Sequence, residues 1–394
     1  MHVPDGFINA PVSAATGVVA AAAVAVSLRG ARRELLDTAG GPAGDAGTGG
    51  GERTAPLAGL VAAFIFAVQM LNFPVAAGTS GHLLGGALAA ILVGPYTGVL
   101  CVSVVLLMQG VLFADGGLTA LGVNITDMAV VTTVVAYAIF RGLLKLAPGR
   151  RRTVTVASFV AALVSVPAAA AAFTGLYALG GTTDVAIGKV FTAMFGVHVL
   201  IGIGEAAITA LTVGAVMAVR PDLVHGARGV AARPLELRNT GPVATPGAPA
   251  AAPAAARTAD EPGATAVPEP AADTAPADTA PAPATAAPRR SARRVWLAGL
   301  AAALLCAGVV SFYASASPDG LEKVAADKGI DKKTEDHATK DSPLADYGVA
   351  DITDTRLSGG LAGVIGVGAT LAVGTGVFVV VRRRRSAAEP AETS

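Results

Sequence analysis

The first two residues of the chain, Met1 and His2, carry three nitrogen atoms that can bind one metal ion together. They are the free amine of Met1, the backbone amide nitrogen of His2 and the His2 imidazole, which can close fused chelate rings. A deprotonated amide nitrogen favours a square plane, and tetragonal nitrogen sites select nickel(II) or copper(II). Cobalt(II) can be held too, less rigidly. Initiator methionine is usually removed only before small residues, so the opening MHVPDGFIN predicts a chelating amino terminus that still lacks a fourth ligand in the plane.

His82 is the residue that could supply this fourth ligand. It lies in the stretch NFPVAAGTSGHLLGG and is the other histidine expected on the outer face of the first seven membrane spans. The stretch contains residues that let backbone turn tightly, as a re-entrant segment buried in protein requires: Pro74, Gly78 and Gly81. Three polar neighbours could orient the imidazoles: Asn72, Thr79 and Ser80. Lone histidines in membrane helices are more often packing residues, so the residues alone leave both roles open.

Four further polar residues fall inside predicted spans: Asn124, Asp127, His198 and Glu205. Intramembrane ionisable groups are functional candidates, because leaving them unpaired in lipid is costly. We expect roles in helix packing or partner contact for all four, and no direct metal ligation. Asp5 is expected to be a turn residue that caps the entry to the first span.

The composition is that of a membrane protein. Of 394 residues, 53% are hydrophobic and 14% are charged, whereas a soluble domain carries about 25% charged residues. The net charge of +1 gives no overall field that would attract nucleic acid. Cys101 and Cys306 stand in apolar runs without a CxxC pattern, so we expect them to be small packing residues.

Nine apolar runs are candidates for membrane spans. Seven lie in the first part of the chain: Ile8–Leu28, Pro56–Leu71, His82–Gly94, Tyr96–Ala114, Leu121–Phe140, Val154–Leu179 and Val190–Val219. Two follow after a long polar stretch: Val295–Tyr313 and Gly359–Val381. The predicted fold is an all-α integral membrane protein, with a seven-helix bundle followed by a C-terminal two-helix membrane hairpin.

Clusters of basic residues set the expected orientation, because short loops rich in lysine and arginine stay in the cytoplasm. The clusters are Arg29–Arg33, Arg141–Arg152, Arg220–Arg238, Arg289–Arg294 and Arg382–Arg385. If all are cytoplasmic, the nine spans alternate without conflict. We therefore expect a multi-pass plasma-membrane protein with an extracytoplasmic amino terminus and a cytoplasmic carboxyl terminus.

Two cytoplasmic stretches are expected to lack regular structure. Asp37–Gly51 is rich in glycine but has no GK[ST] ending, so it is not a P-loop and no bound nucleotide is expected. Thr240–Pro288 consists mainly of alanine, proline and threonine, which is typical of a disordered tether.

A polar outer loop between the last two spans contains the segment SASPDGLEKVA. Its Asp319 and Glu322 could attract cations, but we expect them to be solvated, as we do His337. In the last span, Gly359 and Gly363 are four residues apart, a spacing that lets helices approach closely. This span is therefore expected to pack against a partner helix.

MHVPDGFIN and NFPVAAGTSGHLLGG resemble the two signature stretches of the CbiM/NikM substrate-binding (S) components of energy-coupling factor (ECF) transporters for nickel and cobalt. The resemblance includes the seven-span layout and the segment IGIGEAAIT. SASPDGLEKVA resembles the PDGLE segment of the CbiN/NikN small subunit, which has two helices joined by an extracytoplasmic loop. The implied domains are a metal-binding membrane domain at 1–225, a disordered Pro/Ala-rich linker at 226–290, a PDGLE domain at 291–385 and a cytoplasmic tail at 386–394.

The resemblance implies an S-component bundle that captures a divalent metal at the outer face. Its ligands would be the amine of Met1, the amide and imidazole of His2, and the imidazole of His82. Ni2+ or Co2+ would be the transported substrate, with nickel preferred because the square plane is rigid. A cobalt importer serving cobalamin biosynthesis is the alternative. An ABC-type ATPase and a transmembrane coupling (T) subunit are the implied partners, since the chain itself has no P-loop.

Two other functions fit the sequence poorly. An intramembrane metalloenzyme such as a protease would need an HExxH motif on a helix, and the sequence has none. A metal sensor would need a cytoplasmic signalling domain, whereas the one sizeable cytoplasmic stretch is low in complexity. We therefore expect a transport subunit in the lipid bilayer and no enzyme.

Overall fold

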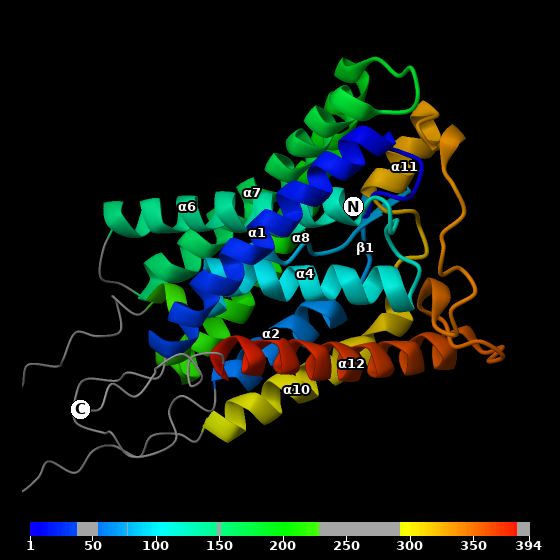
Figure 1. Cartoon of the computed structure of the whole chain (residues 1–394). Helices are drawn as coiled ribbons and strands as arrows, with labels where there is room; N and C mark the ends of the chain where they lie inside the picture. Colours follow the sequence, from blue (N-terminus) through cyan, green and yellow to red (C-terminus); the bar gives the residue numbers. More distant parts are fainter. Residues whose placement is uncertain (38–53, 77, 148–150, 228–291, 384–394) are drawn as a thin grey trace, which may run out of the picture. The chain divides into compact units, whose positions relative to one another are not determined.

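Long apolar helices joined by short loops make up most of the described chain (Figure 1). The computed structural model describes residues 1–37, 54–76, 78–147, 151–227 and 292–383. The glycine-rich loop after Asp37, residues 228–290 of the predicted linker and the predicted tail at 386–394 lie outside the described residues. Gly226 and Ala227, predicted to begin the disordered linker, are instead buried in a 3-10 turn.

The part of the chain before the linker contains α-helices and one short hairpin. The helices are α1 (Ala10–Asp37), α2 (Thr54–Gln69), α3 (Gly86–Val93), α4 (Pro95–Leu112), α5 (Leu121–Asn124), α6 (Thr132–Leu146), α7 (Arg151–Gly180) and α8 (Ile187–Val219). A π-helical turn, Ile125–Val131, joins α5 to α6, so that one continuous helical stretch runs from Leu121 to Leu146. Two 3-10 turns follow α8: Pro221–Leu223 and His225–Ala227.

The part after the linker contains three helices: α10 (Ala292–Gly308), α11 (Gly320–Lys328) and α12 (Thr355–Arg383). One 3-10 turn, Val310–Tyr313, lies between α10 and α11. Two more lie between α11 and α12: Asp331–Lys333 and Ala345–Tyr347. Helix α11 lies in the predicted outer loop, and its first turn is formed by the PDGLE sequence itself. Figure 1 shows α11 next to the amino terminus of the chain.

Within the described ranges, seven helical segments are long and apolar enough to cross a membrane. They are Ala10–Leu35, Pro95–Leu112, Leu121–Leu146, Arg151–Gly180, Ile187–Val219, Arg293–Tyr313 and Thr355–Arg383. Helix α2 corresponds to the second predicted span. It is apolar over Ala55–Gln69, which is shorter than the seven segments above. The all-α membrane fold predicted from the sequence is confirmed.

The third predicted span, His82–Gly94, was wrong as a spanning helix. Only Gly86–Val93 is helical, and eight residues rise about 12 Å against a bilayer core of about 30 Å. The residues before it, 82–85, have no regular structure, yet both they and most of α3 are buried within the protein. Non-helical backbone is tolerated at such depth only when protein surrounds it. Hydropathy registers the apolar residues but not the break in the helix.

A two-stranded antiparallel hairpin leads into this unwound segment. Strand β1 (Phe73–Ala76) pairs with β2 (Thr79–Gly81), in a register that places Phe73 opposite Gly81 and Pro74 opposite Ser80. The tight turn that the glycines and proline predict is therefore present. His82 follows directly after the last residue of β2, Gly81.

The last helix packs closely on the helices α2 and α10. A Cβ atom on Gly366 would come within 2.2 Å of Phe66 in α2, and one on Gly363 within 2.5 Å of the Ala307 carbonyl oxygen in α10. Small residues thus allow the backbones to approach. Of the two glycines whose spacing predicted this packing, Gly363 makes a close approach, whereas a Cβ atom on Gly359 would meet only the Tyr347 carbonyl oxygen, at 3.7 Å. The two-helix hairpin after the linker is consequently anchored on the amino-terminal helices.

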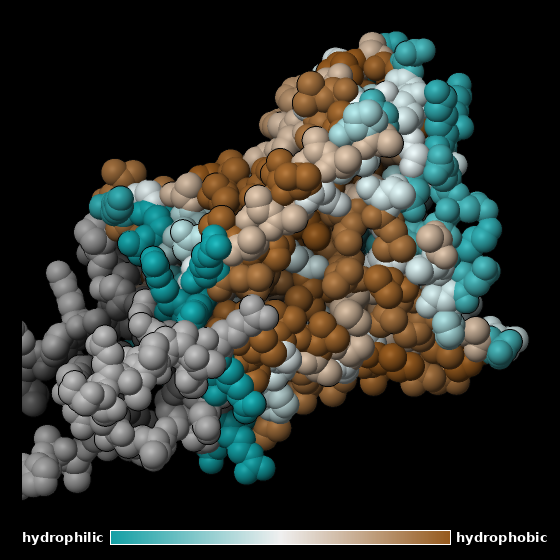
Figure 2. All heavy atoms as spheres, in the orientation of Figure 1, coloured by the Kyte–Doolittle hydropathy of each residue, from teal (hydrophilic) through white to brown (hydrophobic). Residues whose placement is uncertain are grey.

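Hydrophobic residues cover much of the visible helical surface, as Figure 2 shows. Hydrophilic residues gather along the edge formed by α11 and the loop that follows it. This arrangement fits helices that face lipid and a polar loop that faces water.

Candidate metal centre

The first seven residues form no helix and are fastened to the ends of the helices by specific hydrogen bonds. The backbone N–H of Val3 donates to Asn124 Oδ1 at 2.8 Å, and Asn124 Nδ2 donates to the Val3 carbonyl oxygen at 3.1 Å. Asp5 Oδ1 accepts from the backbone N–H of Thr119 at 2.8 Å. Both Met1 and Val3 are buried. The amino terminus is therefore held inside the protein in one position.

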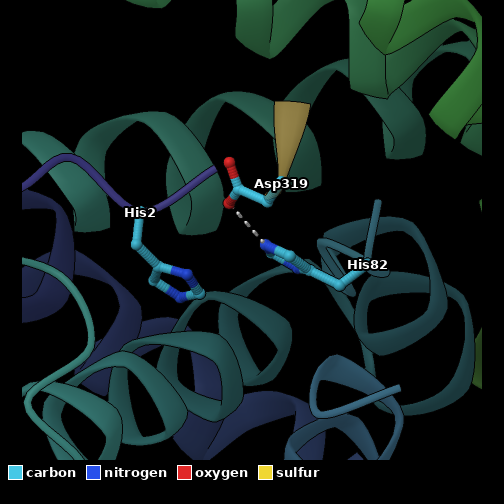
Figure 3. Close-up of side chains that lie close together, drawn as sticks. All are labelled: His2, His82 and Asp319. Atoms are coloured by element: carbon cyan, nitrogen blue, oxygen red, sulfur yellow. Dashed lines mark ion pairs between the residues drawn. The ribbon is translucent and has the colours of Figure 1, made fainter. Parts of the chain in front are cut away.

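The Met1 amine and the two candidate histidines converge at this position. The amine nitrogen lies 2.6 Å from Nε2 of His82, and the His2 and His82 rings stack with their centroids 5.0 Å apart. Figure 3 shows both imidazoles and the carboxylate of Asp319 pointing into the same space. One nitrogen of each ring and one oxygen of Asp319 lie within 4.8 Å of one another.

The local fold around His82 leaves one of its nitrogens available. Nδ1 of His82 lies 3.1 Å from the Leu83 carbonyl oxygen, an acceptor that fixes the proton on Nδ1. Nε2 then carries the lone pair and faces the Met1 amine. The next two backbone N–H groups, of Leu84 and Gly85, donate to the Glu205 carboxylate at 2.7 and 3.1 Å. Glu205 thus satisfies the backbone where the helix is broken.

His2 lies between two side chains that sequence reasoning did not anticipate. Its Nε2 is 3.1 Å from Gln109 Oε1, and its Nδ1 is 3.2 Å from Asp115 Oδ1. Burial lowers the pKa of the His2 imidazole to about 4, with the nearby Asp115 opposing the shift. The ring is therefore uncharged near neutral pH, which is the form that binds metals.

Asp319 is the third member of the cluster, and the expectation that it is solvated was wrong. Its Oδ2 lies 2.8 Å from the Met1 amine and 3.5 Å from His82 Nε2, and the residue is 8% exposed. Burial alone would raise the pKa of the Asp319 carboxyl, but the Met1 ammonium and His82 outweigh burial and hold this pKa well below its usual range. The carboxylate is therefore ionised beside the amine.

The PDGLE sequence positions this carboxylate by capping a helix. Asp319 Oδ1 accepts from the backbone N–H groups of Leu321 and Glu322, while Glu322 Oε2 accepts from the Asp319 N–H. This reciprocal pattern is a capping box. An aspartate followed three residues later by glutamate was the signal in the sequence that could have predicted a helix start at this point.

The polar residues before His82 fasten the PDGLE segment. The Ser80 N–H donates to the Pro318 carbonyl oxygen at 2.8 Å, and its hydroxyl donates to the Ser317 carbonyl oxygen at 2.7 Å. The Asn72 carbonyl oxygen accepts from Ser315 at 2.7 Å, and Thr79 is buried in the hairpin. Within the described chain, the side-chain contacts to the imidazoles come instead from Gln109, Asp115 and Asp319.

A cavity of about 620 Å³ lies beside the cluster and is lined by both parts of the chain. His2, His82 and Asn72 line it from the first part, and Asp319 and Tyr347 line it from the second. The loop after α11 is held beside it by further hydrogen bonds. His337, expected to be solvated, is half-buried, with Nε2 3.1 Å from the Gly116 carbonyl oxygen.

The four intramembrane polar residues do not join the cluster. Asn124 anchors Val3, and Glu205 holds the unwound backbone. His198 Nδ1 lies 2.7 Å from the Met194 carbonyl oxygen, and its Nε2 has no partner among the described residues. Asp127 is buried, and neither of its carboxylate oxygens has a hydrogen-bond partner among the described residues. Packing and support therefore account for Asn124 and Glu205.

This arrangement can bind a transition-metal ion with nitrogen donors. An amine and two imidazoles meet within one buried pocket, and a carboxylate oxygen lies beside them. Binding would release protons from the amine and the amide, since only their deprotonated forms are ligands.

Comparison with known proteins gives two family matches. The family described as "Cobalt uptake substrate-specific transmembrane region" (CbiM) matches residues 2–223, and the PDGLE domain matches residues 293–383. A protein of Archaeoglobus fulgidus named "Putative fused nickel transport protein NikMN" is 37% identical over 227 residues, which are 57% of this chain and 68% of that protein.

Two further similarities have shorter overlap or lower identity. The "Fused nickel transport protein NikMN" of Rhodobacter capsulatus is 39% identical over 158 residues, 40% of this chain and 41% of that protein. The crystal structure of a truncated transition metal transporter is 27% identical and covers 55% of this chain and 99% of its own, with a TM-score of 0.46. A PDGLE domain follows the CbiM region in the same chain. Since the CbiM match covers more than half of the chain, this protein belongs to the CbiM family, whose members are metal transport proteins and not enzymes.

Proposed function

We propose that this chain is the substrate-specific subunit of an ECF importer that captures Ni2+ or Co2+ at the outer face of the membrane. The ligands would be the Met1 amine, the His2 amide and imidazole, and Nε2 of His82. The single observation that carries this proposal is the 2.6 Å separation between the Met1 amine and His82 Nε2, residues 81 positions apart in the sequence. Two basic nitrogens brought together inside a protein are what a shared metal ion requires.

Nickel is the preferred substrate in this proposal. A deprotonated amide and three further nitrogens favour a square plane, the geometry that suits nickel(II). Two relatives are named as fused nickel transport proteins, and this chain likewise joins two domains in one chain. The alternative is cobalt import for cobalamin biosynthesis, which the description of the family as a cobalt uptake region favours.

The energy for import would come from an ABC-type ATPase through a transmembrane T subunit, because the sequence contains no P-loop. The amino terminus would lie outside and the carboxyl terminus inside, since basic residues such as Arg382 and Arg383 end α12. The domains would be the metal-binding domain at 1–225, the linker at 226–290, the PDGLE domain at 291–385 and the tail at 386–394.

The test is the metal content of the purified full chain from cells grown with equal nickel and cobalt, beside a variant with one extra residue before Met1. The insertion keeps every side chain but separates the amine from the His2 amide and imidazole. We expect about one nickel ion in the wild type and none in the variant. Equal metal in both proteins would refute the amino-terminal ligand set, and cobalt in the wild type would keep the site and reverse the metal preference.

The partner proposal has its own test. Metal uptake is measured in cells that express this chain with or without an ECF ATPase and T subunit. We expect uptake only with all components, and uptake by this chain alone would refute the requirement for the partners.

A further inference from the structure

Asp319 places a carboxylate oxygen against two of the proposed metal ligands, although it comes from the other end of the chain. Its Oδ2 is 2.8 Å from the Met1 amine and 3.5 Å from His82 Nε2. We propose that Asp319 is an axial oxygen ligand of the transported metal, so that the fused PDGLE domain sets the coordination number of the site. This inference rests on the function proposed above.

The distances are those of donors around one ion. Two donors at about 2.0 Å from a metal and at right angles lie roughly 2.8 Å apart. The amine and His82 Nε2 are 2.6 Å apart, and the amine and Asp319 Oδ2 are 2.8 Å apart. One ion can therefore contact all three after small adjustments. Because four nitrogens would fill the plane, an oxygen that reaches the same ion has to approach from above or below it.

The carboxylate is fixed in place before any metal arrives. Asp319 Oδ1 caps α11 through Leu321 and Glu322, which leaves Oδ2 directed at the cluster. The residue before it, Pro318, accepts a hydrogen bond from the backbone N–H of Ser80, the middle residue of β2. On its other side, a Cβ atom on Gly320 would lie 3.0 Å from Val197 and Ile201, so this position packs tightly on α8. Such rigidity is what a defined ligand position needs.

Asp115 is the other carboxylate near the histidines, and it is placed differently. It contacts the His2 ring at Nδ1, and its second oxygen accepts a hydrogen bond from the Tyr347 hydroxyl at 2.6 Å. Asp115 does not belong to the set of side chains whose donor atoms lie within 4.8 Å of one another. Asp319 is therefore the carboxylate that can share the ion.

An axial ligand changes which metal the site prefers. Square-planar nickel(II) keeps a filled orbital along the axis, so an axial donor repels it. Cobalt(II) has one electron fewer and accepts a fifth ligand more readily. Asp319 thus lowers the preference for nickel over cobalt, and its removal is expected to raise that preference.

The experiment uses the full-length chain as wild type, Asp319→Asn and Glu322→Gln. Asparagine still caps a helix but loses the carboxylate. Glu322→Gln is the matched control, because it removes one nearby negative charge and keeps an oxygen that accepts from the Asp319 N–H. Each protein is loaded with nickel alone or cobalt alone, and X-ray absorption and electronic spectra give the coordination number. Equal mixtures of both metals then give the ratio bound.

We expect five light-atom ligands in the wild type and in Glu322→Gln, and four in Asp319→Asn. The nickel-to-cobalt ratio is expected to rise about tenfold in Asp319→Asn, which corresponds to about 1.4 kcal/mol. Four ligands in the wild type would overturn the inference even if the variant did not fold, as would an unchanged spectrum and ratio in Asp319→Asn. If the protein with an extra residue before Met1 binds metal like the wild type, the proposed function fails instead.

Discussion

The cluster of Met1, His2, His82 and Asp319 and the polar residues of the membrane-spanning helices contain the same residue types but use them differently. In the cluster, the Met1 amine and His82 Nε2 face one another without a backbone group between them. Deeper in the protein, Glu205 accepts from two backbone N–H groups and Asn124 bonds both polar groups of Val3. Burial and polarity alone therefore do not identify a ligand. What marks a candidate ligand is a nitrogen or oxygen atom that is not used to satisfy the backbone and that lies beside other atoms able to bind a metal.

Replacing a histidine in each region is the strongest test of this comparison. His82→Ala removes a proposed ligand, and we expect metal affinity to fall by more than about 100-fold, since changes to the residues behind a ligand already cost 10- to 100-fold. His198→Ala is the matched control, because it removes an equally buried imidazole outside the cluster, and we expect a change of less than about threefold. Isothermal titration with nickel measures both. An equal loss in the two variants would erase the distinction between the regions.

The support of the amino terminus gives the next largest effect. Asn124→Leu removes both hydrogen bonds to Val3, so the amine is no longer held beside His82. We expect metal affinity to fall roughly 10- to 100-fold, as for other outer-shell changes. Asp127→Asn, three residues further along the same helical stretch, is the control and is expected to leave the affinity unchanged. A weaker effect for Asn124→Leu than for its control would contradict this role.

Gln109 tests the orientation of the His2 ring. Gln109→Leu removes the oxygen that lies 3.1 Å from His2 Nε2. We expect an affinity loss of about tenfold, because a partner on the second ring nitrogen fixes the orientation of a ligating imidazole. Gln109→Glu keeps an acceptor and should bind metal more tightly than Gln109→Leu in the same titration. The reverse order would show that the polar contact is not what orients the ring.

Glu205 should affect stability rather than metal affinity. Glu205→Gln weakens the hold on the Leu84 and Gly85 N–H groups, and a buried group left unsatisfied costs about 1–3 kcal/mol. We expect a lower thermal midpoint in detergent, with metal affinity of the folded protein within a few-fold of wild type. Lost metal binding at an unchanged midpoint would place Glu205 in the metal site and break the comparison.

The helices could be predicted from the sequence where apolar runs are continuous. The predicted spans Val154–Leu179 and Val190–Val219 differ by at most three residues at each end from α7 and α8. The segment His82–Gly94 could not be predicted in this way, because its first four residues are unwound and their backbone is held by Glu205, which lies more than a hundred residues later in the chain. A hydropathy pattern describes neighbouring residues in the sequence, so it does not predict such a long-range contact.

The candidate site was predictable in part for a similar reason. The proposed chelate of Met1 and His2 depends only on their covalent connection, so it could be predicted from the sequence alone. His82 could be proposed from its turn-rich stretch, although the residues alone left its role open. Asp319, Gln109 and Asp115 depend on long-range packing, and nothing local distinguishes Asp319 from a solvated loop residue except the capping pattern of PDGLE.

The contact between Met1 and Asp319 also sets an order of events in synthesis. The two residues are 318 positions apart, and translation at 5–20 residues per second separates them by roughly 15 to 60 s. His82 is made 237 residues before Asp319, so for roughly 12 to 47 s of that interval the amino terminus and His82 both exist while the carboxylate that faces them does not. The newborn chain therefore passes through a stage in which the proposed nitrogen ligands are present without Asp319. Completion of the pocket, and with it any discrimination that Asp319 contributes, comes only when the second part of the chain has folded onto the first.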